Sequence, residues 1–285
     1  MSDKLYDVIV VGAGPAGSYT AYKLAASGYS VAVLEQKDAA GLDVCCTGII
    51  SAECFSSFDI SADVVLGRTG SATFFSPSGK SAKVRSGKAL ACVVERASFD
   101  GAIASKAQCQ GVRYFFSHQV TDIVSGKEDI RAEALCQGSR EVFSARALVL
   151  ANGFQPGLPG KLGLGRINSF LIGAQAEIEI EGLEGIEVYF MPQMEAGVFA
   201  WMVPTSAGKA LVGLLARTEA RSSLTEFLLG PFCQGRVATG GVEIRQKAIP
   251  LGTLPRSYGE RVLVVGDAAG QVKPTTGGGI YLGHL

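Results

Sequence analysis

The residues best suited to do chemistry begin with the glycines at 12, 14 and 17, in the run Gly-Ala-Gly-Pro-Ala-Gly. This G-x-G-x-x-G spacing allows a tight turn, a close approach of backbone to a pyrophosphate and close packing of the next helix. Amides at the start of that helix then point at the phosphates. The turn predicts a dinucleotide site whose contacts are Gly12, Gly14, Ala16 and Gly17.

Glu35 is the acidic residue that such a site needs for the adenosine ribose. It lies at the end of the apolar run 30–34, about twenty residues after the glycine turn, where a carboxylate accepts hydrogen bonds from the ribose. An acid there, rather than an arginine, favours FAD or NAD over NADP. A glycine-rich turn with no ligand is the alternative, because the motif alone gives false positives.

A second group of candidate ligand-binding residues lies near the other end of the chain. Asp267 follows the apolar run 262–265, at a strand end of the kind that meets ligands in doubly wound sheets. Gly278, Gly279 and Ile280 bring unencumbered amides to the start of another helix, where they can stabilise negative charge on a reduced isoalloxazine ring. A simple NAD enzyme has no use for this second site, so the pair favours FAD.

The elements that position these residues alternate between strand and helix. Residues 6–11 are a β-branched apolar run, 15–26 are helical and 30–34 are apolar again, which completes a βαβ unit with parallel strands. Further along we expect a helix at 96–110, an antiparallel meander at 120–145, a buried strand at 147–151, mainly strands over 170–213, a short helix at 222–229 and a last parallel strand at 262–265.

This order predicts an α/β protein: a doubly wound, Rossmann-like FAD-binding domain with an inserted β-rich substrate domain. The FAD-binding domain is expected to cover residues 1–160, with a β excursion at 60–90. The substrate domain is expected at 161–254, and residues 255–285 return to the FAD-binding domain. The loop 156–165, rich in Gly and Pro, is the expected boundary.

Composition excludes several other classes. Lys and Arg number 26, as do Asp and Glu, so no basic field is available for nucleic acid. No apolar run is long enough to cross a membrane, and the start of the chain lacks the features of a signal peptide, so a cytoplasmic protein is expected. Seven dispersed cysteines are expected to be reduced. With only His118 and His284 available, no metal site is expected.

The two nucleotide segments resemble the N-terminal dinucleotide motif and the Gly-Asp motif of the FAD-dependent hydroxylase and reductase superfamily. Residues 94–100, with the sequence VERASFD, resemble the superfamily's V-x-R-x-x-F-D helix start. That resemblance implies that Arg96 contacts the FAD. An ordinary exposed ion pair on a helix is the alternative for this arginine.

Within the superfamily the sequence is most similar to geranylgeranyl reductases, over nearly its whole length. Residues 45–50 (CCTGII) resemble the cysteine-containing loop that faces the flavin, residues 199–204 (FAWMVP) resemble a Y-x-W-x-F-P strand with Phe for Tyr and Val for Phe, and residues 273–281 (KPTTGGGIY) match the glycine-rich flavin loop. The family normally continues well past that loop. We therefore expect the chain to be truncated at its C-terminus, which puts FAD affinity in doubt.

The resemblance implies reduction of carbon-carbon double bonds in isoprenoid chains, with hydride from reduced flavin and a proton from a nearby acid. Cys45 or Cys46 is the expected proton donor, the alternative being a small buried residue. The expected substrate contacts are Tyr189, Phe199, Trp201 and Pro204, although these aromatic residues, like Phe190, are equally typical of sheet core. The electron donor is NAD(P)H or a ferredoxin-like protein, and a peripheral membrane contact is left open.

Two other functions stay open from the sequence. A flavin monooxygenase or halogenase shares both nucleotide segments, although a pair of oxidisable thiols in the flavin loop favours the reductase. A non-catalytic flavin-binding remnant is the alternative from a different class.

Overall fold

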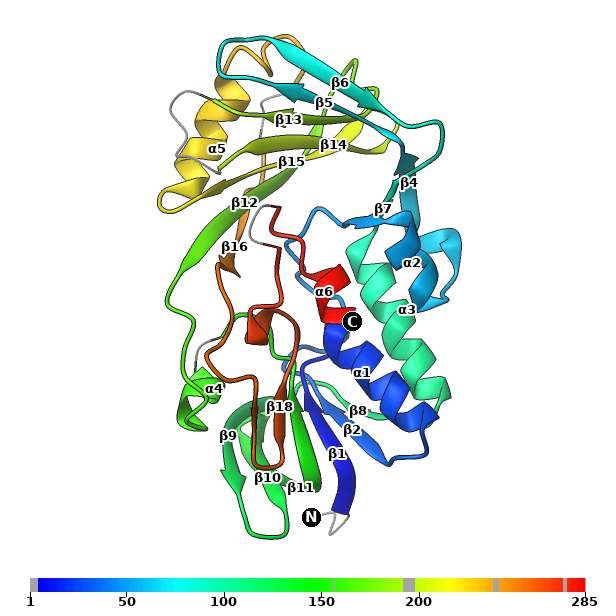
Figure 1. Ribbon diagram of the computed structural model, residues 1–285, viewed down its shortest axis with the longest axis vertical. Coiled ribbons are helices and arrows are strands. Elements are labelled where there is room, and N and C mark those ends of the chain that lie inside the picture. Colours follow the sequence, from blue (N-terminus) through cyan, green and yellow to red (C-terminus); the bar gives the residue numbers. More distant parts are fainter. Residues whose placement is uncertain (1–4, 156, 192–197, 238–240, 274–275, 285) are drawn as a thin grey trace. The chain divides into compact units, whose positions relative to one another are not determined.

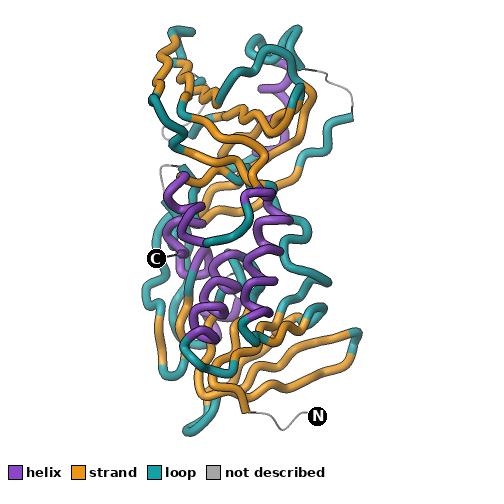
Figure 2. Tube along the Cα trace, turned by 90° about the vertical axis from the view of Figure 1, so that its right-hand side faces the viewer, coloured by secondary structure: helices purple, strands orange, loops and turns teal. Residues whose placement is uncertain are grey.

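The computed structural model describes residues 5–155, 157–191, 198–237, 241–273 and 276–284 (Figure 1). The chain forms two compact units. Unit 1 consists of Met1–Val44, Ala97–Ser169 and Pro250–Leu285, and unit 2 of Cys45–Arg96 and Phe170–Ile249. Strands account for most of the regular structure (Figure 2).

Unit 1 is built on an eight-stranded sheet in the order β17-β18-β11-β1-β2-β8, and β10 and β9 continue it from β11. Neighbours are parallel from β18 to β8. This is the Rossmann-like α/β arrangement that the sequence predicts. Its strands are β1 (Leu5–Val11), β2 (Val31–Leu34), β8 (Arg113–Phe115), β9 (Gln119–Ser125), β10 (Ile130–Cys136), β11 (Ser139–Leu150), β17 (Tyr258–Gly259) and β18 (Val262–Val264).

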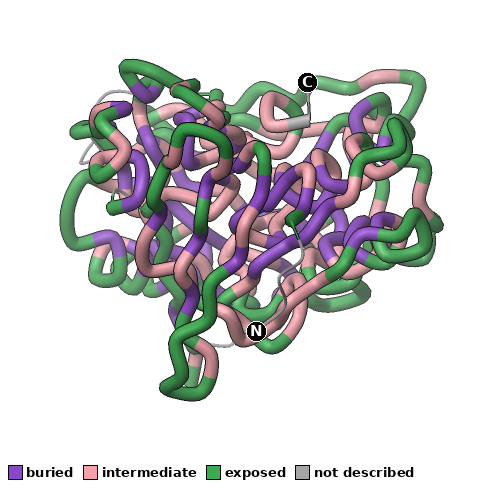
Figure 3. Tube along the Cα trace, turned by 90° about the horizontal axis from the view of Figure 1, so that it is seen from below, coloured by how far each residue is buried: buried purple, intermediate pink, exposed green. Residues whose placement is uncertain are grey.

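The central strands are apolar at consecutive positions because both faces of the sheet are covered. In β1, Ile9 belongs to one buried cluster together with Leu148 of β11, while Val10 belongs to the cluster on the other face with Val149. Figure 3 colours the chain by burial, with buried stretches mainly inside the trace and exposed residues mainly in its outer turns. The helices of unit 1 are α1 (Pro15–Ala26), α3 (Arg96–Cys109, which begins at the boundary with unit 2), α4 (Gly157–Lys161) and α6 (Ile280–His284), with a short 3-10 helix, η2 (Gly266–Ala269).

β11 differs from the prediction of a meander that ends before a separate strand. It is one continuous strand of 12 residues. Its first half pairs antiparallel with β10 from Ser139 onward, and its second half pairs parallel with β1. Ser144 and Ala145 each pair with both partners. The meander and the nucleotide-binding sheet are therefore one sheet.

Unit 2 contains a seven-stranded sheet in the order β16-β12-β15-β14-β13-β5-β6 and a three-stranded sheet in the order β3-β7-β4. Helix α5 (Ala220–Leu229) contacts β12 and β15 and covers the buried cluster on one face of the larger sheet. The other elements are β3 (Ile49–Ser51), α2 (Ala52–Phe58), η1 (Ala62–Val64), β4 (Val65–Thr69), β5 (Ser71–Phe75), β6 (Ser81–Arg85), β7 (Ala91–Val94), β12 (Phe170–Glu179), β13 (Ile186–Tyr189), β14 (Ala200–Ser206), β15 (Lys209–Ala216) and β16 (Arg245–Pro250).

The units divide the chain at other residues than the predicted 160 and 254. The loop expected at 156–165 carries α4, and its Leu158 and Leu164 are buried in a core cluster of unit 1. Leu254 lies in the same cluster. The excursion predicted at 60–90 is longer, because all of Cys45–Arg96 belongs to unit 2. No helix among the described residues has both the length and the apolarity needed to cross a bilayer.

Candidate functional site

The glycine turn between β1 and α1 has the close backbone packing that its spacing predicts. Gly12 has φ +106°, and a Cβ there would lie 2.4 Å from the carbonyl oxygen of Ala151. A Cβ on Gly17 would lie 2.0 Å from the carbonyl oxygen of Gly12. Any side chain at these two positions would force the helix away from the sheet. Around Gly14, by contrast, a Cβ would meet nothing within 4 Å.

The start of α1 is suited to an anion. Gly14 is the N-cap, no side chain caps the helix, and its first turn contains no acidic residue. Pro15 occupies the first helical position, where the missing N–H costs no hydrogen bond. The remaining amides of the first turn and the helix dipole together favour binding of a phosphate. The open space beside Gly14 is the place for it.

Glu35 is held at the end of β2 and reaches back to the glycine turn. Its carboxylate accepts a hydrogen bond of 2.7 Å from the Ala13 amide through Oε2 and one of 3.0 Å from the Lys37 amide through Oε1. Its own amide donates to the Phe115 carbonyl, 2.9 Å away. Each carboxylate oxygen keeps acceptor capacity for a ribose hydroxyl. The predicted pairing of turn and acid is therefore present in the structure.

The second predicted half-site lies beside the first within unit 1. A Cβ on Gly266, just after β18, would lie 2.9 Å from the Ala16 Cβ, and a Cβ on Gly283 of α6 would lie 3.4 Å from it. Figure 1 shows α6, in red, next to the blue α1, and the two helices are in contact. Small residues therefore bring the two ends of the chain together at Ala16.

Asp267 and Gly279 are neighbours in this second half-site. Asp267 Oδ1 would lie 2.6 Å from a Cβ on Gly279, so a side chain there would displace the Asp267 carboxylate. The glycine loop is closed by hydrogen bonds from the Gly277 amide to the Lys273 carbonyl and from the Lys273 amide to the Gly278 carbonyl. Ile280 begins α6 directly after the loop. Pro274 and Thr275 of the predicted loop motif lie outside the described residues.

Asn152 is a candidate ligand residue that the sequence analysis missed. It follows β11 at its carboxyl end, where a Cβ on Gly12 would lie 3.0 Å from the Asn152 Cα. Both polar atoms of its amide side chain are buried, with no hydrogen-bond partner among the described residues. A buried amide without partners costs free energy, so the site fits a polar cofactor. The available signal was its position directly after the apolar run 147–151.

Arg96 is the first residue of α3 and is half-buried. This location agrees with the predicted helix start, since the V-x-R-x-x-F-D pattern places its arginine there. The contact of Arg96 with the cofactor stays a prediction.

The cysteine loop of unit 2 runs into β3. Cys45 and Cys46 are both free and half-buried. Gly48 has φ +73°, and a Cβ there would lie 2.3 Å from the Val94 carbonyl oxygen, so the loop packs tightly on β7. The Thr47 hydroxyl donates a hydrogen bond of 2.7 Å to Gln175 Oε1 on β12. The loop is therefore tied to the large sheet as well as to the small one.

Gln175 starts a row of residues across the large sheet. Gln175 is opposite Gly213, Gly213 is opposite Trp201, and Trp201 is opposite Val188. Opposite residues in a sheet share a face, so the cysteine loop is tied to the face that carries Trp201. The indole lies against Gly213, where a Cβ would be 2.4 Å from the ring. Its Nε1 is buried without an acceptor among the described residues.

Phe199 and Phe190 belong to the same face as Trp201, and we call these three residues the aromatic face. The ring centres of Phe199 and Trp201 are 5.7 Å apart, and those of Phe190 and Phe199 are 6.2 Å apart. All three rings retain some exposure. Pro204, which is also a predicted substrate residue, is half-buried within β14.

Tyr189 lies on the opposite face of the sheet. It is 0% exposed, and its ring stacks on Phe75 with centres 4.7 Å apart. Its hydroxyl donates to Glu187, and burial raises the pKa of this phenol. The side chain is a member of the core beneath α5, which is the packing alternative that the sequence left open.

The Cys45 thiol is held in its protonated form. Burial raises its pKa, and the neighbouring Cys46 raises it further, against the smaller opposing effects of Lys247 and Arg245. A buried thiol of this kind is a weak nucleophile and remains available as a proton donor at neutral pH.

Comparisons with known proteins agree with the oxidoreductase that the sequence predicts. Residues 6–179 match the family of pyridine nucleotide-disulphide oxidoreductases. The digeranylgeranylglycerophospholipid reductase of Methanocaldococcus jannaschii is 30% identical over 290 residues, an alignment that covers 98% of this chain and 74% of that protein.

Solved structures share the fold. A geranylgeranyl bacteriochlorophyll reductase-like protein from Thermoplasma acidophilum is 22% identical with a TM-score of 0.86, covering 99% of this chain and 75% of that one. A flavin-dependent brominase is 20% identical with a TM-score of 0.79, covering 99% and 76%. Given the matched family and the reductase from Methanocaldococcus jannaschii, the chain belongs to the FAD-dependent oxidoreductases that include the digeranylgeranylglycerophospholipid reductases.

Proposed function

We propose that this protein reduces the carbon-carbon double bonds of geranylgeranyl chains carried by a glycerophospholipid. The observation that carries the proposal is the Thr47–Gln175 hydrogen bond, which ties the cysteine loop to the aromatic face. A thiol and a set of aromatic rings on one face suit an apolar alkene that must receive a proton.

The residues of unit 1 would hold the cofactor. The first turn of α1 would bind the pyrophosphate, Glu35 the ribose, and Asn152 and Asp267 further polar groups of FAD. When bound and reduced, FAD supplies a hydride to one alkene carbon. The domain assignment follows from this division: unit 1 binds the cofactor and unit 2 the substrate.

The proton for the second carbon would come from Cys45 or Cys46. One new C–H bond forms from the hydride and the other from the thiol proton, so the substrate gains two hydrogen atoms and two electrons per double bond. The resulting thiolate then takes a proton from solvent. The aromatic face would exclude water around the alkene, which prevents loss of the hydride to side reactions.

A basic hollow in unit 2 favours a phosphate-bearing substrate. This hollow of about 470 Å³ lies beside β5 and β6. Its charged lining residues are Arg68, Lys83, Arg85, Lys88 and Glu184. Lys83 pairs with Glu184 at 3.4 Å and Arg68 donates to the Cys92 sulfur, so Arg85 and Lys88 are the cations we assign to the headgroup. Guanidinium and ammonium groups together suit a phosphate.

The reductant would be NAD(P)H or a ferredoxin-like protein, and the lipid substrate would bring the protein into peripheral contact with a membrane. The same fold in a flavin-dependent brominase leaves oxygen chemistry as the rival, although a fold likeness does not carry an activity.

The test uses purified protein loaded with FAD, reduced by dithionite without oxygen, and mixed with digeranylgeranylglycerophospholipid in detergent. Mass spectrometry is expected to show products that have gained two hydrogen atoms for each double bond. A control with the lipid and reduced free FAD should show none. The proposal would be overturned in favour of oxygen activation if the lipid stayed unchanged without oxygen and a hydroxylated or halogenated product formed in air.

A further inference from the structure

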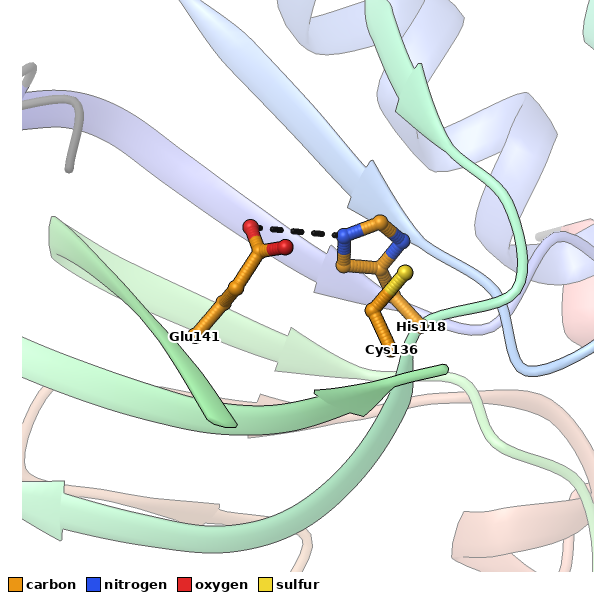
Figure 4. Close-up of side chains that lie close together, drawn as sticks. All are labelled: His118, Cys136 and Glu141. Carbon is orange, nitrogen blue, oxygen red and sulfur yellow. Dashed lines mark ion pairs between the residues drawn. The ribbon is translucent and has the colours of Figure 1, made fainter. Parts of the chain in front are cut away.

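Three potential metal ligands converge at one end of the meander in unit 1, where the His118 amide donates a hydrogen bond of 2.8 Å to the Glu35 carbonyl oxygen. They are His118, Cys136 and Glu141, and their ligand atoms all lie within 4.8 Å of one another. Figure 4 shows the imidazole, the thiol and the carboxylate pointing toward one another from neighbouring segments of the sheet.

Sheet register explains why these distant residues meet. Gln119 of β9 is opposite Leu135 of β10, so His118 reaches the level of Cys136. On the other side of β10, Ala134 is opposite Glu141 of β11. Side chains alternate along a strand, and Cys136 and Ala134 therefore share a face. All three ligand groups project from that face.

The imidazole of His118 is fixed in position before any ligand binds. Its Nδ1 is 2.6 Å from the Phe116 carbonyl oxygen, and its ring meets Phe115 and Phe143 edge-on, each with a centre distance of 5.7 Å. The side chain is only 11% exposed. A carbonyl oxygen can only accept, so Nδ1 carries the hydrogen and Nε2 is the free ligand atom. Metal-binding histidines commonly have such a backbone partner.

The distance between Nε2 of His118 and Oε2 of Glu141 is 3.5 Å. That distance is long for a hydrogen bond. It matches the edge of about 3.3–3.5 Å that joins the nitrogen and oxygen ligands of a tetrahedral zinc ion. The Cys136 sulfur must approach more closely to complete the site. Rotation of the cysteine and movement of the Glu141 carboxylate, 49% exposed, can supply that approach.

We propose that His118, Cys136 and Glu141 bind one zinc ion, with water as the fourth ligand. Thiolate and imidazole ligands select zinc and similar transition ions over magnesium and calcium. The thiol proton of Cys136 passes to buffer as the sulfur coordinates the metal. Because the ligands come from β10, β11 and the segment before β9, the ion joins three strands and stabilises the sheet.

An ion pair between His118 and Glu141, 3.5 Å apart, is the competing explanation for two of the three residues. It gives no role to Cys136. The experiment therefore centres on the sulfur. Chelator-treated protein with its FAD bound is titrated with cobalt(II), whose d–d bands lie at longer wavelengths than the flavin absorption, and zinc is then added as competitor. We expect one saturable tetrahedral cobalt site that zinc displaces.

Cys136→Ser and Glu141→Gln are expected to weaken cobalt and zinc binding by roughly tenfold or more. Cys109→Ser is the matched control, because this cysteine is exposed on α3. Zinc should raise the Tm of the wild type and of the control but of neither ligand variant. Flavin content and circular dichroism establish that each variant folds. Because Glu141 is exposed, Glu141→Gln should fold even if Cys136→Ser does not, and it then tests the site by itself.

Equal metal affinity in Cys136→Ser and Cys109→Ser would overturn the site. So would wild-type protein that takes up no cobalt. A lower Tm for Glu141→Gln without any metal effect in the wild type would identify the ion pair instead.

Discussion

The hydroxyl of Thr47 donates a hydrogen bond of 2.7 Å to the side-chain oxygen of Gln175, 128 positions further along the chain. Cys45 and Cys46 directly precede Thr47, and Gln175 is in the same sheet row as Trp201 through Gly213. One hydrogen bond therefore joins the segment that holds the thiols to the face that holds the aromatic rings.

Replacing Thr47 by valine should slow alkene reduction while leaving FAD content unchanged. The variant keeps the shape of the side chain but cannot donate to Gln175, and a lost hydrogen bond of this kind costs about 1 kcal/mol. We expect kcat to fall roughly fivefold to tenfold, with recovery in Thr47→Ser. Turnover of the valine variant at the wild-type rate would show that the loop is positioned by other contacts.

The pH dependence of turnover should identify the proton donor. Because burial raises the pKa of Cys45, its thiol stays protonated at neutral pH, and the rate should fall only on the alkaline side, as the thiolate forms. Cys45→Ser should lower the rate and remove this alkaline decline, while Cys46→Ser should retain it. The opposite pattern in the two variants would assign the proton to Cys46.

Glu35→Gln should weaken FAD binding. The carboxylate accepts hydrogen bonds from the Ala13 and Lys37 amides, and charge-assisted bonds contribute about 1.5–3 kcal/mol each. Fluorescence titration of flavin-free protein should give a Kd roughly tenfold to hundredfold higher than wild type. Glu226→Gln, at an exposed position of α5, is the control, and equal loss of affinity in both would remove Glu35 from the site.

Enlarging Ala16 should separate the two halves of the cofactor site. Its Cβ is the nearest side-chain atom to both Gly266 and Gly283, so Ala16→Leu would push η2 and α6 away at a cost of about 1–3 kcal/mol. We expect a lower Tm together with lower FAD occupancy. Ala26→Leu, at the exposed last position of α1, should change neither quantity. A normal flavin content in Ala16→Leu would show that the packing of Gly266 and Gly283 on Ala16 does not hold the cofactor site together.

The basic hollow should matter only for substrates that carry a phosphate. Arg85→Ala combined with Lys88→Ala removes two cations from its lining. The KM for the glycerophospholipid should rise, while the KM for geranylgeraniol, which lacks the phosphate, should stay the same. An equal rise for both substrates would place the effect in the fold and not in headgroup recognition.

Much of the nucleotide site could be predicted because its requirements are local. The glycines of 12–17 are needed within one turn, and Glu35 follows at a distance set by one helix and one strand. The bond from Ala13 to Glu35 and the packing of Gly266 on Ala16 depend on how strands are ordered in the sheet. Asn152 needed the same information, since its missing partners are visible only in three dimensions.

Two features of the strands limited the prediction further. Successive side chains along a strand point to opposite faces, so Tyr189 packs under α5 while Phe190, the next residue, joins the aromatic face. The sequence could not say which face α5 covers. His118 and Glu141 are far from any Cys-x-x-Cys or His-x-x-His spacing, and only the register of β9, β10 and β11 brings them to Cys136.

The packing of Gly266 and Gly283 on Ala16 has a consequence for the protein while it is being synthesised. α1 leaves the ribosome early, but Gly266 and Gly283, which pack against it, are synthesised only after the whole of unit 2. A nascent chain that ends before β18 therefore presents the phosphate turn without its second wall, and contacts of such long sequence separation form slowly. Flavin capture should then be a late event, completed only after Gly266 and Gly283 have both emerged.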